Sequence, residues 1–382
     1  MSMKIGFVLD DRLDKPDGVQ QYVKLVAHWM KSQGHEVHYL VGDSPKATEK
    51  NVHNLGRTVG VKFNKNRMAI PLPASRKKIK ALLDHEKFDV LHVQMPYSPL
   101  LAGRVVSAAG PHTAVIGTFH ILPHGFLSSA GTRLLGKVLS RNKRRFDLFF
   151  SVSEAARTFS RTHFGIHSIV MPNVVDIAKY QIGTPIKKYA DKRNIVFLGR
   201  LVERKGAQHL LEAVKQLVAS TDKDTAASIR VIICGDGPLR SELKAAAKSV
   251  GTEVVFTGFL KEEDKADYLA SAEIAVYPAT GGESFGIVLI EAMAARAGVV
   301  LAGNNPGYAS VLSTIPEVLF DPHDAVAAGT LLRRILSDDR LAISLHERQQ
   351  ELVRTFAITK VGPEIEACYR QALAKQHHKR DT

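Results

Sequence analysis

The chain has 382 residues, of which 45% are hydrophobic and 24% charged, a composition typical of a folded protein with more than one hydrophobic core. No run of about eighteen apolar residues occurs, so the composition excludes a membrane-spanning helix. The formal net charge of +14 favours polyanionic partners, which include nucleic acid, phosphorylated substrates and anionic lipid head groups.

Short apolar runs alternate along the chain with longer amphipathic stretches. The apolar runs predict strands at KIGFVL (4–9), EVHYLV (36–41), DVLHV (89–93), AVIGTF (114–119), LFFSV (148–152), SIVMP (168–172), NIVFLG (194–199), RVIICG (230–235), VVFTG (254–258), IAVYP (274–278) and GVVLAG (298–303). The amphipathic stretches predict helices that include 18–33, 207–218, 286–295, 338–356 and 359–376. This alternation predicts an α/β fold with parallel sheets and right-handed crossovers.

A polar stretch at 173–194 interrupts the alternation and predicts a linker between two doubly wound, Rossmann-like domains. The expected N-terminal domain covers residues 1–175, with residues 359–382 crossing back onto it, and the C-terminal domain covers 186–358. Ligands of such sheets bind at the carboxyl ends of the strands, so the loops there are the places to search for a site.

The N-terminal sequence MSMKIGFVLDD enters a strand-like run at once and lacks the features of a signal peptide. Cys234 and Cys368 lie far apart without metal-ligand spacing. We therefore expect a cytoplasmic location and no metal site.

Two loops have groups that suit a phosphate. In LDKPDGVQQYV, Gly18 opens a helix whose first amides and dipole favour an anion, although a plain glycine turn explains one glycine equally well. In FLGRLVERKG, Arg200 and Lys205 flank a strand-end loop and can clamp a diphosphate, or can be solvated surface charges.

The stretch GGESFGIVLIEAM (281–293) carries two carboxylates in an unusual setting. Glu283 precedes a helix whose first amides lie near residues 285–288, and it can bind a ligand or merely favour the helix dipole. Glu291 falls among apolar residues of that helix, where a charge requires a partner. An acid held there can accept hydrogen bonds from the hydroxyls of a ribose.

His120 ends a central strand in IGTFHILPHG. A histidine there can donate to a sugar hydroxyl or a phosphate near neutral pH, and the alternative is a structural histidine with satisfied hydrogen bonds.

Taken in order, these motifs resemble the retaining glycosyltransferases with two facing Rossmann-like domains, the GT-B architecture. ESFGIVLIE is similar to their Glu-x7-Glu signature, FLGRLVERKG and GDGPLRSEL to their second domain, and PNVVD to their interdomain PNGVD. More narrowly, DGVQ (17–20), GHEVHYL, DVLHV, TFH and GGESFGIVLIEAMAA resemble the actinobacterial phosphatidylinositol mannosyltransferases. Those enzymes transfer α-mannose from GDP-mannose to a membrane lipid.

The resemblance implies a nucleotide-sugar donor, with no tightly bound cofactor and no metal. It implies that Gly18 approaches the donor diphosphate and that Arg200 and Lys205 clamp it. It implies that Glu283 holds the hydroxyls of the transferred sugar, that Glu291 holds the donor ribose, and that His120 contacts the sugar. The residues expected to line the donor around these carboxylates are Phe285, Gly286, Ile287 and Val288. In the family the acceptor hydroxyl attacks from the side on which the diphosphate leaves, so the enzyme mainly positions the reactants.

This sequence departs from the family pattern at three positions. Asp17 stands where a glycine is frequent and brings negative charge toward a diphosphate, which bears on donor binding or donor preference. Val174 replaces the glycine of PNGVD, and Arg296 replaces a glycine at the end of the Glu-x7-Glu helix. We interpret these last two as structural.

The basic charge is concentrated in the first half of the chain. Residues 74–87 carry Arg76, Lys77, Lys78 and Lys80 beside an apolar stripe. A second basic stretch covers residues 131–146. Both stripes are interpreted as mainly core, and the charges as directed at an anionic membrane surface. In the mannosyltransferases the helix that matches residues 76–80 is also the one that meets the lipid. In VKFNKNRM (61–68), Asn64 and Arg67 are candidates for an acceptor phosphate.

The leading hypothesis is a peripheral enzyme on the inner face of the cytoplasmic membrane that moves mannose from GDP-mannose to phosphatidylinositol or a related lipid. One alternative is the same fold with a UDP-sugar, acting on another lipid or a soluble acceptor. Another is a non-catalytic, basic polyanion-binding protein on this scaffold. Nucleic acid is not the expected partner, because the charges are not interleaved with aromatic residues and no nucleic-acid motif is recognised.

Overall fold

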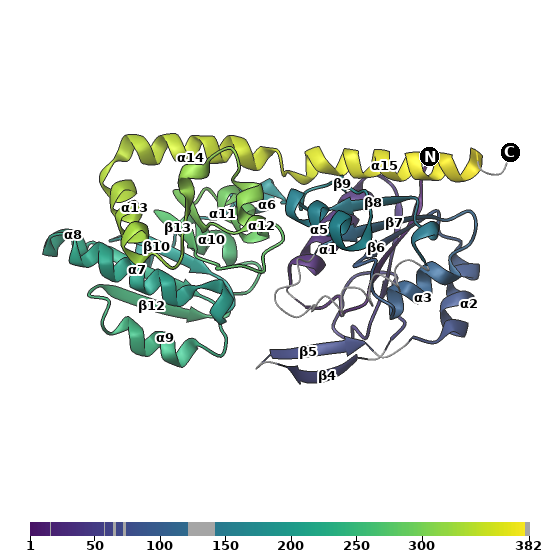
Figure 1. Cartoon of the computed structure of the whole chain (residues 1–382), viewed down its shortest axis with the longest axis horizontal. Coiled ribbons are helices and arrows are strands. Elements are labelled where there is room, and N and C mark those ends of the chain that lie inside the picture. The colour runs from purple at the N-terminus through teal and green to yellow at the C-terminus, as the bar shows by residue number, and fades with distance from the viewer. Residues whose placement is uncertain (16, 57, 64–65, 72–73, 121–141, 379–382) are drawn as a thin grey trace. The chain divides into compact units, whose positions relative to one another are not determined.

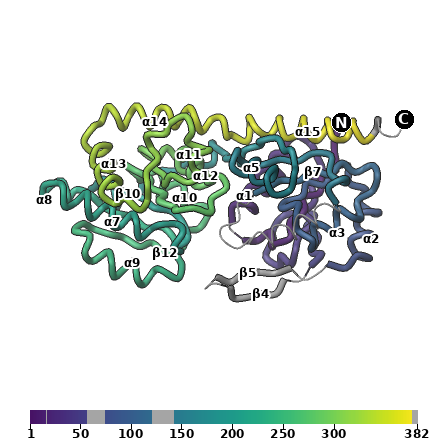
Figure 2. The backbone as a smooth tube through the Cα atoms, in the orientation of Figure 1, coloured from purple at the N-terminus to yellow at the C-terminus, as the bar shows by residue number. Residues whose placement is uncertain are grey.

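The structure is a computed structural model that describes residues 1–15, 17–56, 58–63, 66–71, 74–120 and 142–378 (Figure 1). The chain divides into two compact units. Unit 1 consists of Met1–Val174 and Ile358–Thr382, and unit 2 of Val175–Ala357. The backbone trace in Figure 2 shows the last helix returning along unit 1, where it packs against the first helix of the chain and the strand Ala114–Phe119.

Unit 1 is built on a seven-stranded parallel sheet in the order β3-β2-β1-β6-β7-β8-β9. Its strands are β1 (Lys4–Leu9), β2 (Glu36–Val41), β3 (Val52–Asn54), β6 (Val90–Gln94), β7 (Ala114–Phe119), β8 (Leu148–Ser151) and β9 (Ile169–Val170). Alternate residues of β1 enter different cores. Ile5 and Phe7 pack with helices α1 (Gly18–Ser32) and α15 (Ile358–His378), whereas Val8 packs with α2 (Arg76–Glu86) and α3 (Leu101–Ala108). The sheet is therefore covered on both faces, which explains the continuous apolar runs.

Unit 2 repeats the plan with a six-stranded parallel sheet in the order β12-β11-β10-β13-β14-β15. Its strands are β10 (Arg193–Leu198), β11 (Ile229–Cys234), β12 (Glu253–Gly258), β13 (Ile274–Tyr277), β14 (Val299–Gly303) and β15 (Leu319–Phe320). Its helices are α6 (Ile177–Gln181), α7 (Ala207–Ala219), α8 (Lys223–Ala227), α9 (Arg240–Ala247), α10 (Lys265–Ala270), α11 (Ile287–Ala294), α12 (Pro306–Val311), α13 (Ala325–Ser337) and α14 (Asp339–Arg354).

Each sheet has a point at which the strand order reverses. In unit 1, β1 lies between β2 and β6, and in unit 2, β10 lies between β11 and β13. Successive crossovers leave such a point in opposite directions and open a space at the carboxyl ends of the strands, where doubly wound folds bind ligands. The strand-end loops singled out from the sequence follow β1, β7, β10 and β13.

The predicted α/β class and all eleven predicted strands are confirmed. An antiparallel hairpin, β4 (Thr58–Phe63) and β5 (Asn66–Pro71), was not predicted, because only strand–helix alternation was expected.

The prediction of a linker over 173–194 is wrong for most of its length. Helix α6 packs against α10 and α11 within unit 2, and Tyr180 and Tyr189 anchor the segment by burying their rings. Of the described helices, none is long and apolar enough to cross a membrane.

Candidate donor site

The loops that follow β10 and β13 meet backbone to backbone in unit 2. The β10 loop passes through a short 3-10 turn, Glu203–Lys205, and reaches Gly206, whose φ is +75°. A Cβ atom at Gly206 would lie 1.9 Å from the carbonyl oxygen of Pro278, at the end of β13. The amide of Thr280 also donates to the carbonyl of Arg204 at 3.0 Å. This close approach fixes the basic side chains of one loop beside the carboxylate of the other.

Glu283 lies between two cations of the β10 loop. Its carboxylate pairs with Lys205 Nζ at 2.8 Å and with the Arg204 guanidinium at 2.5 Å, and its side chain is 12% exposed. Burial raises the pKa of Glu283, but the charges and hydrogen bonds of Lys205 and Arg204 outweigh that effect and hold it below its usual value. Glu283 is therefore ionised at neutral pH, and the site contains an anion and two cations within hydrogen-bond reach.

Sequence reasoning singled out Lys205 and Glu283, which the structure brings together, but it missed Arg204. The position of Arg204 beside Lys205 in the basic run VERKG could have indicated that it belongs to the same site. Arg200 lies earlier in the same loop, directly after β10, and is exposed.

The beginning of helix α11 borders Glu283. Gly286 is its N-cap residue, and Ile287 and Val288 form its first turn, where the amides have no acceptor within the helix. Phe285 is buried and its ring packs edge-on against Phe356, with ring centroids 5.4 Å apart. The side chain of Phe285 therefore anchors the loop in the core, so only its backbone is placed to line a ligand.

Glu291 lies one turn further along α11 and is 7% exposed. Its carboxylate pairs with Lys265 Nζ at 3.5 Å, and the same ammonium pairs with Glu262 at 2.7 Å. Burial lowers the pKa of Lys265, but the attraction of Glu291 and Glu262 outweighs it, so the net shift is upward. Glu262 also accepts from the buried Tyr180 hydroxyl at 3.3 Å. The apolar surroundings of Glu291 implied a partner but not which one, because Lys265 is distant in sequence.

In unit 1, His120 follows β7 and is buried. Its Nε2 lies 2.6 Å from the carboxamide oxygen of Gln94, and its ring packs edge-on against Tyr22. Because that oxygen only accepts, Nε2 carries the proton. Burial lowers the pKa of His120 to about 3, so the ring is neutral at physiological pH. His120 therefore interacts as a neutral donor and acceptor rather than as a cation.

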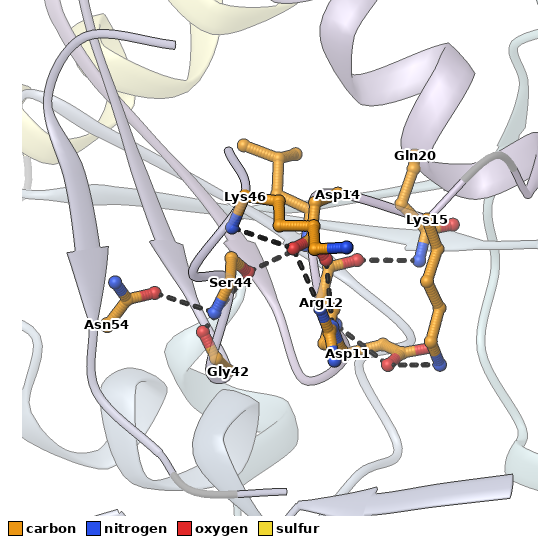
Figure 3. A network of polar contacts seen from close by, with 10 residues as sticks. Asp11, Arg12, Asp14, Lys15, Gln20, Gly42, Ser44, Lys46 and Asn54 are labelled. Atoms are coloured by element: carbon orange, nitrogen blue, oxygen red, sulfur yellow. Dashed lines mark hydrogen bonds and ion pairs between the residues drawn. The ribbon is translucent and has the colours of Figure 1, made fainter. Parts of the chain in front are cut away.

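The loop between β1 and α1, which leads to Gly18, is held by an ordered polar network (Figure 3). Arg12 pairs with Asp14 at 2.8 Å, and Lys15 pairs with Asp11 at 2.7 Å. The hydroxyl of Ser44 accepts from the amide of Leu13 at 2.8 Å. The network ties this loop to the segment that follows β2, and thereby fixes where α1 begins.

The structure shows the setting of all three departures from the family pattern. Asp17 is the N-cap residue of α1, is exposed, and makes no side-chain capping hydrogen bond. Arg296 has a φ of +57°, the left-handed conformation that glycine adopts freely. Val174 is buried in the core of unit 1.

The basic residues of α2 are exposed, whereas its apolar stripe is core, as the sequence predicted. Ile79 and Leu83 pack under α2, and the exposed cations are Arg76, Lys77, Lys78 and Lys80. Arg67 lies in β5, paired with Lys62 of β4. Asn64 lies outside the described residues, as does most of the second basic stretch at 131–146.

Comparison with known families assigns each half of the chain to a glycosyltransferase domain. Residues 16–179 match the model for Glycosyltransferase Family 4, and residues 182–352 match the model for Glycosyl transferases group 1. Among solved structures, Anabaena HepE in complex with UDP aligns with a TM-score of 0.77 at 17% identity and covers 97% of this chain and 100% of that chain.

Together with the two parallel sheets, these matches show that the chain belongs to the glycosyltransferases of the GT-B fold. Within that family it is similar to the phosphatidyl-myo-inositol mannosyltransferase of Mycolicibacterium smegmatis, with 31% identity over 96% of this chain and 93% of that protein. It is also similar to the GDP-mannose-dependent monoacylated alpha-(1-6)-phosphatidylinositol monomannoside mannosyltransferase of Corynebacterium glutamicum, with 24% identity over 88% of this chain and 90% of that protein. The protein is therefore an enzyme that transfers a glycosyl group from a nucleotide-sugar donor.

Proposed function

We propose that the enzyme transfers mannose from GDP-mannose to a phosphatidylinositol-type lipid, with retention of the α configuration. The observation that carries this proposal is the grouping of Glu283, Lys205 and Arg204 at the strand-order reversal of unit 2. The names of the relatives supply the choice of mannose and of the inositol lipid.

In this proposal unit 2 binds the donor. Arg200 and Lys205 neutralise the diphosphate, and Glu283 accepts hydrogen bonds from hydroxyls of the sugar. The first amides of α11, at Phe285 to Val288, donate to the donor. Glu291 accepts from the ribose hydroxyls. An ionised carboxylate accepts such bonds through both of its oxygens, which fits the lowered pKa of Glu283.

Catalysis then rests on stabilising the leaving diphosphate. As the bond between C1 of the sugar and the phosphate oxygen breaks, negative charge develops on the phosphate, and Lys205 and Arg200 stabilise it. The acceptor hydroxyl attacks from the same side, and the departing phosphate oxygen takes its proton. Glu283 fixes the sugar during this step. In unit 1, His120 is a neutral hydrogen-bonding group suited to a sugar hydroxyl.

Unit 1 carries the groups proposed for the acceptor and the membrane. Gly18 lies at the start of α1, where close backbone approach and the first helical amides favour a phosphate group. The four exposed cations of α2 are attracted to anionic lipid head groups, each by about 1 kcal/mol. Arg67, on the hairpin, and Asn64 are candidates for the acceptor phosphate. The enzyme in this proposal acts as a peripheral protein on the inner face of the cytoplasmic membrane.

Turnover with defined substrates tests the proposal. Purified enzyme is incubated with vesicles that contain phosphatidylinositol and with GDP-mannose, UDP-glucose or UDP-N-acetylglucosamine in separate reactions, and lipid products are identified by mass spectrometry. We expect a monomannosylated phosphatidylinositol from GDP-mannose alone, with the α anomer by NMR. A lipid product formed only from a UDP-sugar would refute the donor assignment, and a β-linked product would refute retention.

A further inference from the structure

A second cluster of functional side chains lies in unit 1 at β2, β3 and the end of α2, whereas His120 follows β7. His38 is on β2, His53 is on the edge strand β3, and Glu86 is the last residue of α2. Leu40 pairs with His53 in the sheet register, so His38 and His53 project from the same face. One ligand atom from each of His38, His53 and Glu86 lies within 4.8 Å of the other two.

The two imidazoles meet nitrogen to nitrogen. His38 Nδ1 lies 2.8 Å from His53 Nε2, and the rings are parallel within 4°. On its other side, His38 Nε2 lies 2.8 Å from a carboxylate oxygen of Glu36. Glu36 only accepts, so Nε2 carries the proton and the lone pair of Nδ1 points toward His53. A carboxylate that orients a histidine in this way is the usual outer partner of a metal-bound imidazole.

The charge balance of the cluster also favours a cation. Glu36 and Glu86 share one ammonium, that of Lys4, at 3.0 and 3.1 Å. Two carboxylates and one ammonium leave one negative charge beside two ring nitrogens. The side chains of His38 and Glu86 are 5% and 14% exposed, whereas that of Glu36 is 50% exposed, so water screens the charge of Glu86 less than that of Glu36.

We propose that His38 Nδ1, His53 Nε2 and a carboxylate oxygen of Glu86, which now lies 3.8 Å from His38 Nε2, form a binding site for a divalent cation of the zinc class. Two imidazole nitrogens and one carboxylate oxygen are ligands that zinc prefers, at about 2.0–2.2 Å. The cation replaces the proton that the two rings now share. The ring nitrogens then have to separate by about half an ångström to reach tetrahedral spacing. His53 provides that movement, because β3 is a three-residue strand at the edge of the sheet.

The site is structural rather than catalytic in this proposal, since its ligands lie on β2, β3 and α2, and β1 and β6 separate β2 from β7, which His120 follows. It connects the edge strand β3 and the end of α2 to the central strand β2. Neither the donor nor the lipid takes part, so the inference stands or fails independently of the proposed function.

Zinc titration of the metal-depleted full chain tests the site. Because the chain has 16 histidines, weak background binding is expected, and the matched control is His28→Ala, which removes an exposed histidine from α1. We expect competition with a chromogenic chelator to show one site in the wild type and in His28→Ala. Zinc affinity should fall at least tenfold in both His53→Ala and the near-isosteric Glu86→Gln. Equal zinc affinity in His53→Ala, Glu86→Gln and His28→Ala would overturn the proposal.

The ammonium of Lys4 provides a second test with the opposite sign. The ammonium of Lys4 neutralises part of the negative charge of Glu36 and Glu86, which would otherwise attract a metal cation. Lys4→Met should therefore bind zinc more tightly, by about threefold to tenfold. Zinc should also raise the melting temperature of Lys4→Met and of the wild type, because a ligand bound only by the folded state stabilises it. An unchanged or weakened zinc affinity in Lys4→Met would contradict the assignment. If the cluster were only a hydrogen-bond network that binds no zinc, removal of the Lys4 ammonium would not increase zinc affinity.

Discussion

At the scale of single residues, Glu283 is the group whose setting most constrains the chemistry. It is almost buried, yet two cations keep it ionised. Glu283→Gln keeps the shape but removes the charge. It leaves Lys205 and Arg204 without their anion and, in the function proposed above, weakens the hydrogen bonds to sugar hydroxyls. We expect kcat/KM to fall by about 100-fold or more, mainly through kcat, because the enzyme loses one strong interaction with the transition state. Steady-state kinetics with the donor measures kcat and KM.

The matched control is Glu212→Gln, an exposed carboxylate on α7 of the same unit. It loses the same charge and should keep wild-type kinetics. If both variants turned over equally well, Glu283 would have no role in transfer.

Lys265 is the positioning residue for Glu291. Lys265→Met removes the ammonium that neutralises Glu291 and Glu262 in a largely buried setting. Glu262 keeps its pair with Lys179 at 2.9 Å, but Glu291 loses the ammonium that separates it from Glu262. We therefore expect the KM for the donor to rise by about tenfold and the free energy of unfolding to fall by about 1–3 kcal/mol.

Lys261→Met is the control for this change, because Lys261 forms a pair with Glu263 that is about three-quarters exposed on both sides. Exposed pairs contribute about 0–1 kcal/mol, so this variant should match the wild type in donor KM. A normal donor KM in Lys265→Met would show that Glu291 does not depend on Lys265 for its position.

At the scale of elements, the contact between the β10 and β13 loops depends on Gly206. Gly206→Ala combines an unfavourable positive φ with a collision against the carbonyl of Pro278. Gly34 has a similar φ of +82° but has no atom within 4 Å of an added Cβ. Gly34→Ala therefore measures the cost of the positive φ alone, without a steric collision. We expect Gly34→Ala to cost about 1–2 kcal/mol and Gly206→Ala clearly more, with a loss of activity that Gly34→Ala does not share. The free energy of unfolding in urea and the turnover number are measured for both variants. Equal losses of unfolding free energy in Gly206→Ala and Gly34→Ala would contradict the close contact between the two loops.

Helix α2 is the element expected to meet the membrane. Replacing Arg76, Lys77, Lys78 and Lys80 by Gln removes four exposed charges without touching the buried stripe. At about 1 kcal/mol each, co-sedimentation with anionic vesicles should weaken by about 100-fold or more at low salt. The control replaces four exposed lysines of unit 2: Lys215, Lys223, Lys244 and Lys248. If vesicle binding weakened equally in both variants, the net charge of the protein rather than the position of the cations on α2 would determine membrane binding.

The elements also show what the sequence alone can predict. Eleven of the thirteen strands described in the two sheets were found because residues such as Ile5 and Val8 enter opposite cores, which makes the runs apolar throughout. The short edge strands β3 and β15 were missed. Lys205 and Glu283 were found because they follow central strands. Arg204, Lys265 and the hairpin were missed. Their significance depends on which distant segment lies beside them, and no local pattern encodes that.

At the scale of the whole molecule, buried neutral histidines make the stability of unit 1 depend on pH. Burial lowers the pKa of both His92 and His120 to about 3, from 6.5. Between pH 6.5 and 3 the unfolded chain binds protons that the folded unit does not. The free energy of unfolding is therefore greatest above pH 6.5 and falls with acidification, by up to about 1.4 kcal/mol per pH unit for each histidine.

The single tryptophan, Trp29, packs against the core of unit 1, so its fluorescence reports the unfolding of this unit. Urea titrations at pH 7.5, 6 and 5 should give a decreasing free energy of unfolding. His92→Gln should flatten this dependence, whereas the exposed His28→Gln should leave it unchanged. A pH dependence identical in His92→Gln and the wild type would show that His92 takes up its proton in the folded unit.

The central claim is that unit 2 binds GDP-mannose through Glu283 and Glu291, and donor-dependent thermal stabilisation tests it most directly. The melting temperature of the full chain is measured with GDP-mannose, UDP-glucose and UDP-N-acetylglucosamine, for the wild type and for Lys265→Met. A ligand that binds only the folded state raises the melting temperature according to its affinity. The account predicts stabilisation by GDP-mannose, little effect of either UDP-sugar, and a smaller GDP-mannose shift in Lys265→Met. Stabilisation by a UDP-sugar alone, or no response to GDP-mannose, would contradict it.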